Sequence, residues 1–173
     1  MKFKLFCFAS LIFFLIPLKG YSIGAGIQIG INPFSISNSE YSENSFEGNI
    51  TGTLRFSRLP LVAGAGFNAG ICDSDFIFVF STFADCFIID HQIKNNWNFY
   101  SGIGLIGNLN FDTAFNVFPE AGIRVFLGTS VIFIDNFIEL NLQANAQPSV
   151  LFKNEEPEFR LSFPIESGIR FHF

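Results

Sequence analysis

Charge is scarce in this chain of 173 residues, because only 14% of them are Asp, Glu, Lys or Arg, against about 25% in an ordinary soluble domain. Ten bases stand against 15 acids, a net charge of −5, which argues against the basic surface that nucleic acid requires. Polar residues are also few, since 49% of the residues are hydrophobic. This composition excludes intrinsic disorder. The length suits a single domain with a sizeable core.

Long hydrophobic runs are lacking as well. The longest covers Leu5 to Leu18, 14 positions, where a membrane-spanning helix needs about 20. The basic segment Met1–Lys4 precedes this run and Lys19–Ser22 follows it, which is the layout of a secretory signal peptide rather than of an uncleaved anchor. We expect cleavage after Ser22, with Gly20 as the alternative. The chain then divides into a signal peptide, residues 1–22, and one domain, residues 23–173.

Cysteine and histidine are too few to build a metal site or a disulfide framework. Cys72 and Cys86 are interpreted as free, small apolar residues. No Cys/His pair has the spacing of metal ligands. Asp73 and Asp75 share a short loop and could at most contact Ca²⁺ weakly. We therefore expect no metal and no cofactor.

Few residues of the chain are suited to catalysis. The chain has two histidines, and we expect both His91 and His172 to be solvated residues at the periplasmic rim. Asp90 and His91 are adjacent in a strand, so their side chains point to opposite faces and form no dyad. The geometry that an enzyme needs is missing, and no catalytic residue is predicted.

Alternation of apolar and polar residues is what the chain has in abundance. In residues 159–173 seven of the eight odd positions are apolar, and no even position is large and apolar. This period of two indicates strands. The same pattern occurs in residues 23–32, 49–57, 61–71, 97–111, 117–128 and 137–147, while residues 76–89 are apolar on both faces. The connections are expected near residues 35–47, 58–60, 72–75, 90–96, 112–116, 129–136 and 153–157.

The composition of the two faces indicates which one contacts lipid and which one lines the barrel interior. The polar face is mostly Gly, Asn, Ser and Gln, which suits a narrow barrel interior. The apolar face is rich in Ile and in Phe, of which the chain has 26, and this suits lipid. A β-protein in lipid must close, because every backbone group has to be paired. The prediction is an all-β, eight-stranded antiparallel up-and-down transmembrane barrel with both termini in the periplasm, and with a bulge or break at Pro119 and at Pro164.

The last residues add a resemblance. Ile169, Phe171 and Phe173 alternate at the end of the chain, and this looks like the C-terminal signal that the barrel assembly machinery reads in outer-membrane barrels. Segments 97–102, 153–157 and 163–173 resemble a family of small spirochaetal outer-membrane β-barrels, and the size and strand pattern are similar to those of OmpX and OmpW. The resemblance implies an outer-membrane location with lipid and the assembly machinery as partners. It says little about activity, and the short loops depart from OmpX.

Six charged residues of the polar face are expected to form a network inside the barrel: Arg55, Glu120, Arg124, Glu139, Glu166 and Arg170. The residue numbers of two cross-strand partners in a hairpin add up to twice the residue number at the centre of its loop. A loop centred near residue 155 sets Glu139 opposite Arg170, and a turn centred near residue 132 sets Glu139 opposite Arg124.

Two functions follow from what this network does. If it plugs the lumen, the protein has a structural or surface-interaction role, with loops that meet an extracellular ligand. If the lumen stays open, the protein is a small passive channel for small or hydrophobic solutes, as OmpW-like barrels are thought to be. The glycines of the first, third and fifth predicted strands leave room on one side of the lumen, so the sequence keeps both alternatives.

Overall fold

The computed structural model describes residues 23–38, 46–56, 59–72, 75–94, 96–112, 116–153 and 156–173, without the side chains of Cys72 and Asp75. The predicted signal peptide and the side chains of Asp73 and Asp75 thus lie outside the described part. Within it, all regular elements are strands. No helix among the described residues is long and apolar enough to cross a membrane.

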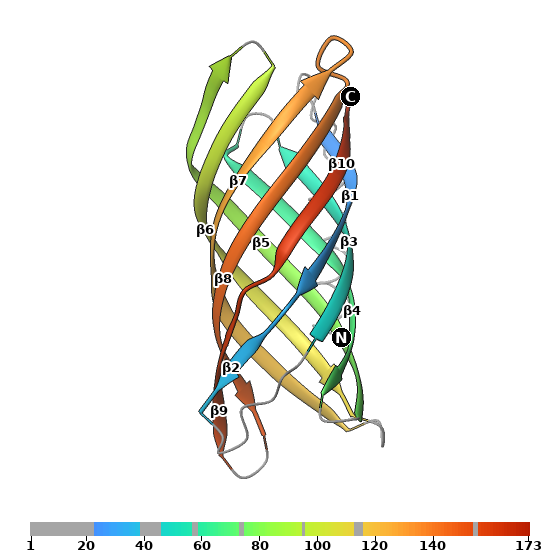
Figure 1. Ribbon diagram of the computed structural model, residues 1–173, viewed down its shortest axis with the longest axis vertical. Helices are drawn as coiled ribbons and strands as arrows, with labels where there is room; N and C mark the ends of the chain where they lie inside the picture. Colours follow the sequence, from blue (N-terminus) through green and yellow to red (C-terminus); the bar gives the residue numbers. More distant parts are fainter. Residues whose placement is uncertain are drawn as a thin grey trace, which may run out of the picture.

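The strands form one closed antiparallel sheet (Figure 1). Neighbours in the chain are mostly neighbours in the sheet, and β10 closes it by pairing with both β1 and β8. β1 and β2 are two parts of one wall strand, as are β9 and β10, so the barrel has the eight strands that were predicted. The elements are β1 (Ile23–Asn32), β2 (Ser35–Ser37), β3 (Phe46–Phe56), β4 (Leu61–Cys72), β5 (Asp75–Lys94), β6 (Trp97–Phe111), β7 (Val117–Phe133), β8 (Ile138–Phe152), β9 (Pro157–Ser162) and β10 (Ile165–His172).

The two composite strands break side by side. Ile31 pairs with Ile165 before the break and Ser35 pairs with Ser162 after it, a slip of one residue between β1–β10 and β2–β9. The predicted break at Pro164 is confirmed. The predicted irregularity at Pro119 is wrong, because β6 and β7 stay in register through this residue. The ladder with β8 begins only at Glu120, so the missing N–H of Pro119 costs no hydrogen bond on that side.

Strand ends depart from the prediction where a strand continues past its apolar pattern. β1 and β6 have the predicted bounds, but β5 runs to Lys94 and β7 to Phe133, so the expected connections at 90–96 and 129–136 are shorter. Near its end β5 has a bulge between Phe87 and Ile89. The extra residue reverses the alternation, so that Phe87 and Asp90 both face inward.

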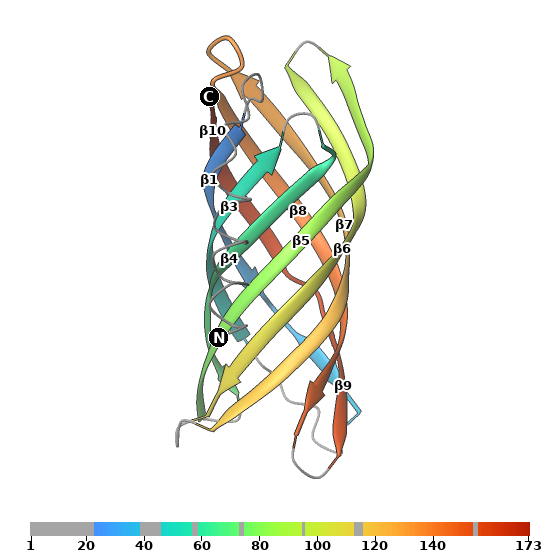
Figure 2. The same ribbon diagram turned by 180° about the vertical axis from the view of Figure 1, so that it is seen from behind.

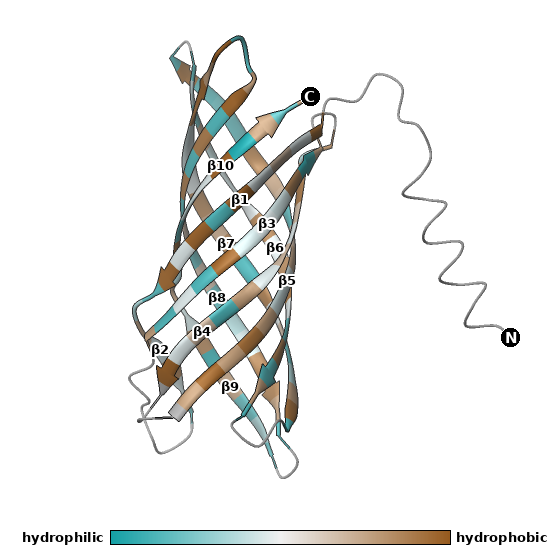
Figure 3. Cartoon of the chain, turned by 90° about the vertical axis from the view of Figure 1, so that its right-hand side faces the viewer, coloured by the Kyte–Doolittle hydropathy of each residue, from teal (hydrophilic) through white to brown (hydrophobic). Residues whose placement is uncertain are grey.

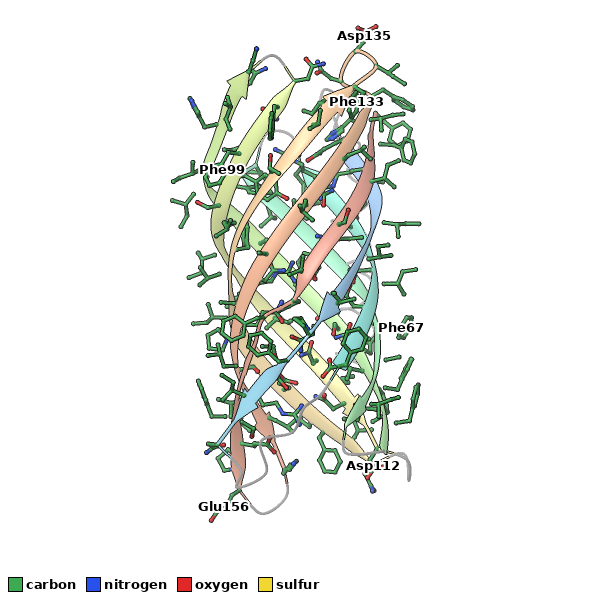
Figure 4. All side chains as sticks on the ribbon, viewed as in Figure 1. Phe67, Phe99, Asp112, Phe133, Asp135 and Glu156 are labelled. Carbon is green, nitrogen blue, oxygen red and sulfur yellow. The ribbon has the colours of Figure 1, made fainter. Side chains whose placement is uncertain are left out.

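The barrel is tall and its strands are steeply inclined (Figures 1 and 2). One end carries the turn at Asp135 and the last residue, Phe173, and is called the turn end here. The other carries Asp112 and Glu156 and is called the loop end (Figure 4).

Hydrophobic and hydrophilic residues alternate along the wall strands (Figure 3). Large apolar side chains project outward from the wall (Figure 4). Ile88 and Leu105 are 71% and 67% exposed, and the labelled rings of Phe67 and Phe99 project away from the barrel. The predicted assignment of the polar face to the lumen therefore agrees with the burial of the side chains.

Candidate functional site in the barrel lumen

The interior of the turn end is organised around one carboxylate, that of Glu139 on β8. Its side chain is 0% exposed. Arg55 donates from Nη1 to Oε1 (2.8 Å), Arg170 donates from Nη1 to Oε2 (3.0 Å), and His172 Nε2 lies 2.7 Å from Oε2. Arg55 also donates from Nη2 to Asp90 Oδ2 (2.7 Å). Two arginines and two carboxylates are thus held in one layer across the lumen.

A layer of aromatic rings lies next to this cluster. Phe87 meets Tyr100 and Phe126 edge to face, with ring centroids 5.1 and 5.5 Å apart. The Arg55 guanidinium carbon is 5.0 Å from the centroid of Phe87, which is within cation–π range. Phe83 completes the buried cluster with these three rings and Val62. These rings come from the strand that the sequence showed as apolar on both faces and from its two successors.

The middle of the barrel is organised around Arg124 on β7, whose side chain is 2% exposed. Arg124 Nε lies 3.1 Å from Asp85 Oδ2, and its Nη1 and Nη2 donate to the two oxygens of Glu166. Asn145 donates to Glu166 Oε2 (2.9 Å). The guanidinium carbon lies 4.2 Å from the centroid of Phe83, so the aromatic layer separates the Arg124 and Glu139 clusters.

Three further carboxylates lie towards the loop end, and one of them, Glu47 on β3, lines a cavity there. Glu120 is buried and accepts hydrogen bonds from Asn110 Nδ2 (3.0 Å) and Ser149 Oγ (2.5 Å). Glu158 on β9 binds Ser37 Oγ (2.6 Å), Lys153 Nζ (2.5 Å) and Arg160 Nε (3.1 Å). Ser37 faces this cluster because the slip at the break between β1 and β2 reverses the alternation there.

Space remains on both sides of the packed layers. A cavity of about 50 Å³ lies in the loop-end half, lined by Asn49, Ser81, Asn108 and Glu120 among others. A second cavity of about 350 Å³ lies at the turn end, lined by Arg55, Asp90 and His172 on its polar side.

The structure places all six predicted lumen residues inside the barrel, and it forms one of the two predicted pairs. Arg170 lies opposite Glu139 in the β8–β10 ladder. The expected contact of Glu139 with Arg124 is wrong, because β7 is longer than predicted and sets Ile132 opposite Glu139. Arg124 binds Asp85 and Glu166 instead.

Sequence reasoning missed several polar groups that line the lumen, among them Asp85, Asp90, Glu158 and His172. The signal for Asp85 was a single acid within an apolar run, and the bulge hid Asp90. The expectation that His172 is a solvated rim residue is wrong, because its side chain is 14% exposed and contacts Glu139. His91 is exposed and lies opposite Phe99.

The residues of the predicted assembly signal lie on the outer face of β10 and just beyond it. Ile169 is exposed, and Phe171 and Phe173 both contact the ring of Phe137, at centroid distances of 5.7 and 5.8 Å. Phe173 and Ile23 exchange backbone hydrogen bonds of 3.0 and 3.2 Å, which close the wall at the turn end.

Neither cysteines nor clusters of metal ligands form a candidate site among the described residues. Cys86 is a free, exposed thiol on the outer face. Among the described residues no three His, Cys, Asp or Glu side chains are grouped so that they could hold a metal ion.

The fold defines a class, the closed eight-stranded antiparallel β-barrel with an apolar outer surface and a polar interior. No family model and no curated protein matches the chain. Two solved structures are similar to it. Neisserial surface protein A is 17% identical with a TM-score of 0.61, over 89% of this chain and 97% of that one. Ail, the attachment invasion locus protein of Yersinia pestis, is 9% identical with a TM-score of 0.48, over 88% of this chain and 97% of that one.

Proposed function

We propose that the chain is an integral outer-membrane β-barrel protein with a structural or surface-interaction role and a plugged lumen. The observation that carries the proposal is the polar interior and apolar exterior of the barrel: Arg124 and Glu139 are among its most deeply buried side chains, while many Ile, Leu and Phe side chains are exposed. A soluble monomer rarely exposes apolar patches beyond a few hundred Å². A closed barrel satisfies every ladder hydrogen bond internally, which is what lipid demands of a spanning β-protein.

An outer membrane is the location that this architecture favours. Bacterial single-chain outer-membrane barrels have an even number of antiparallel strands. We propose secretion by a cleaved signal peptide, insertion by the barrel assembly machinery and contact with outer-membrane lipid. The loop end would then face outward and meet an extracellular ligand. Fractionation tests the location, since the protein should stay in the outer-membrane fraction after alkaline carbonate extraction.

The plug is proposed because three layers of side chains lie in the lumen between the two cavities: the Glu139 cluster, the aromatic rings and the Arg124 cluster. Single-channel recording in planar bilayers tests it. The purified protein should give no conductance steps. Phe126→Ala removes a ring from the middle layer and should produce steps, whereas Leu105→Ala, which shortens a side chain on the outer face, should not.

A passive channel for small or hydrophobic solutes is the second candidate. The turn-end cavity favours it, because about 350 Å³ is the size of a small ligand pocket. Conductance steps from the unmodified protein, or solute uptake by liposomes that contain it, would favour the channel over the plug.

A further inference from the structure

The loop-end cavity is lined by oxygen atoms that have no partner among the described residues. Ser81 Oγ, Asn49 Oδ1 and Asn108 Oδ1 are all buried and unpartnered, and all three residues line the cavity. Ser81 as a whole is 7% exposed. Buried polar atoms without a partner are costly and rare, so three of them around one space indicate something that binds there.

The cross-strand register brings these groups together. Ser81 lies opposite Asn108 in the β5–β6 ladder, and Asn108 lies opposite Glu120 in the β6–β7 ladder. All three side chains face the lumen, so neighbouring Cβ atoms are about 5 Å apart. A hydroxyl, an amide and a carboxylate therefore stand side by side on one wall of the cavity.

The three acids that line this cavity, Glu47, Glu120 and Glu166, outnumber the two arginines that line it, Arg124 and Arg160. Arg160 also pairs with Glu158. Arg124 is the one guanidinium shared by Asp85 and Glu166. The hydrogen-bond donors to Glu120 are the neutral side chains of Asn110 and Ser149, and no ion pair joins it to a base among the described residues. Each carboxylate oxygen can accept more than one bond. The cavity thus offers negative charge together with free acceptors.

We infer that this cavity binds a hard cation, with Ca²⁺ as the best fit, through oxygens of Ser81, Asn108, Asn49 and Glu120. Ca²⁺ takes six to eight oxygen ligands and accepts hydroxyl, amide and water oxygens beside carboxylates. The volume of about 50 Å³ has room for about four waters, enough for a partly hydrated ion. Metal-ligand spacing could not reveal this site in the sequence, because its oxygens come from four strands and are mostly neutral.

Thermal unfolding in detergent tests the site. The full chain is stripped with a chelator and melted in 10 mM CaCl₂, and in choline chloride or NaCl of the same ionic strength. An affinity near 1 mM, as in extracellular calcium modules, should raise Tm by about 3–6 °C in CaCl₂ alone. Isothermal titration with CaCl₂ should give one ion per chain.

Two serine variants make the test specific. Ser81→Ala removes the unpartnered hydroxyl from the cavity and should abolish most of the rise in Tm. Ser130→Ala is the matched control, because Ser130 is also a buried serine with an unpartnered hydroxyl but does not line this cavity. It should keep the full rise. Glu120→Gln should weaken calcium binding at least tenfold.

The inference is overturned by any of three results. An equal rise in CaCl₂ and NaCl would show screening rather than binding. An equal rise in the unmodified protein and in Ser81→Ala would place the ion elsewhere. The absence of both a rise and a titration signal would mean that the cavity holds water alone.

Discussion

Replacing Glu139 by Gln should be among the most destabilising conservative changes in this protein. The carboxylate is fully buried and contacts Arg55, Arg170 and His172 within 3.0 Å. Gln keeps the shape and removes the charge, so Arg170 loses its one ion pair among the described residues, while Arg55 keeps Asp90. Removing one partner of a buried ion pair costs about 3–5 kcal/mol, and we expect a loss in that range.

The share of Arg170 in this loss can be measured by a double-mutant cycle. Arg170→Gln leaves Glu139 with Arg55 and His172, so it should cost less, about 1.5–3 kcal/mol for a hydrogen bond to a charged group. In the double variant the same pair is lost only once. The coupling energy should therefore lie well above about 1 kcal/mol. Urea unfolding in detergent, followed by the fluorescence of Trp97, the single Trp of the chain, gives the four free energies.

Arg124 supplies the control for this cycle. It binds Asp85 and Glu166 and shares no ion pair with Glu139, so Arg124→Gln and Glu139→Gln should be additive within about 0.5 kcal/mol. If the Glu139–Arg170 coupling is as small as this control, the charges are separated by water. The reasoning from a packed lumen then fails, and the channel function gains support.

Three further predictions concern the wall of the barrel. Replacing Phe173 by Ala should lower outer-membrane levels in cells and leave the Tm of refolded protein nearly unchanged, because the ring is 74% exposed; unchanged levels would refute its role in assembly. Gly66→Ala should prevent folding, since a Cβ there would lie 2.2 Å from the Ile50 carbonyl oxygen, whereas at Gly52 the nearest atom is 3.8 Å away and Gly52→Ala should change the free energy of unfolding by under about 0.5 kcal/mol. Circular dichroism in detergent should show mostly strand, and a helical spectrum would contradict the fold.

The fold was predictable because most strands show an alternation of apolar and polar residues within their own sequence. The alternation of residues in β1 and β6 fixed both their bounds and their inward faces, since a one-residue error would expose every polar side chain to lipid. Strand ends were less predictable. In β7 the residues from Thr129 to Phe133 continue the ladder without a clear apolar pattern, because hydrogen bonds to β6 and β8 hold them.

That error in one turn changed a predicted partner in the site. The β7–β8 turn lies at residues 134–137, where Ile134, Asp135 and Asn136 all have positive φ. The prediction placed the centre of this turn three to four residues too early. This error shifted the predicted β7–β8 register by seven residues and so placed Arg124 opposite Glu139. The β8–β10 register was one residue from the predicted sum, and there Arg170 lies opposite Glu139.

Contacts across the lumen could not be predicted from pairing at all. Arg55 reaches Glu139 from β3, and Arg124 reaches Asp85 on β5 and Glu166 on β10. These side chains meet through the interior of the barrel and not along a ladder. Their partners depend on strand tilt and side-chain length, which the alternation of residues does not contain.

Because of the bulge in β5, the side chains that face the lumen depend on the number of residues in this strand as much as on their identities. Deleting Ile88 would change no inward-facing side chain chemically, yet it would rotate the rest of β5 by one position. Asp90 would then turn towards lipid and leave Arg55, while His91 would turn inward. Homologous chains that gain or lose one residue here should therefore differ in the charge of the turn-end cavity even where every aligned residue is the same.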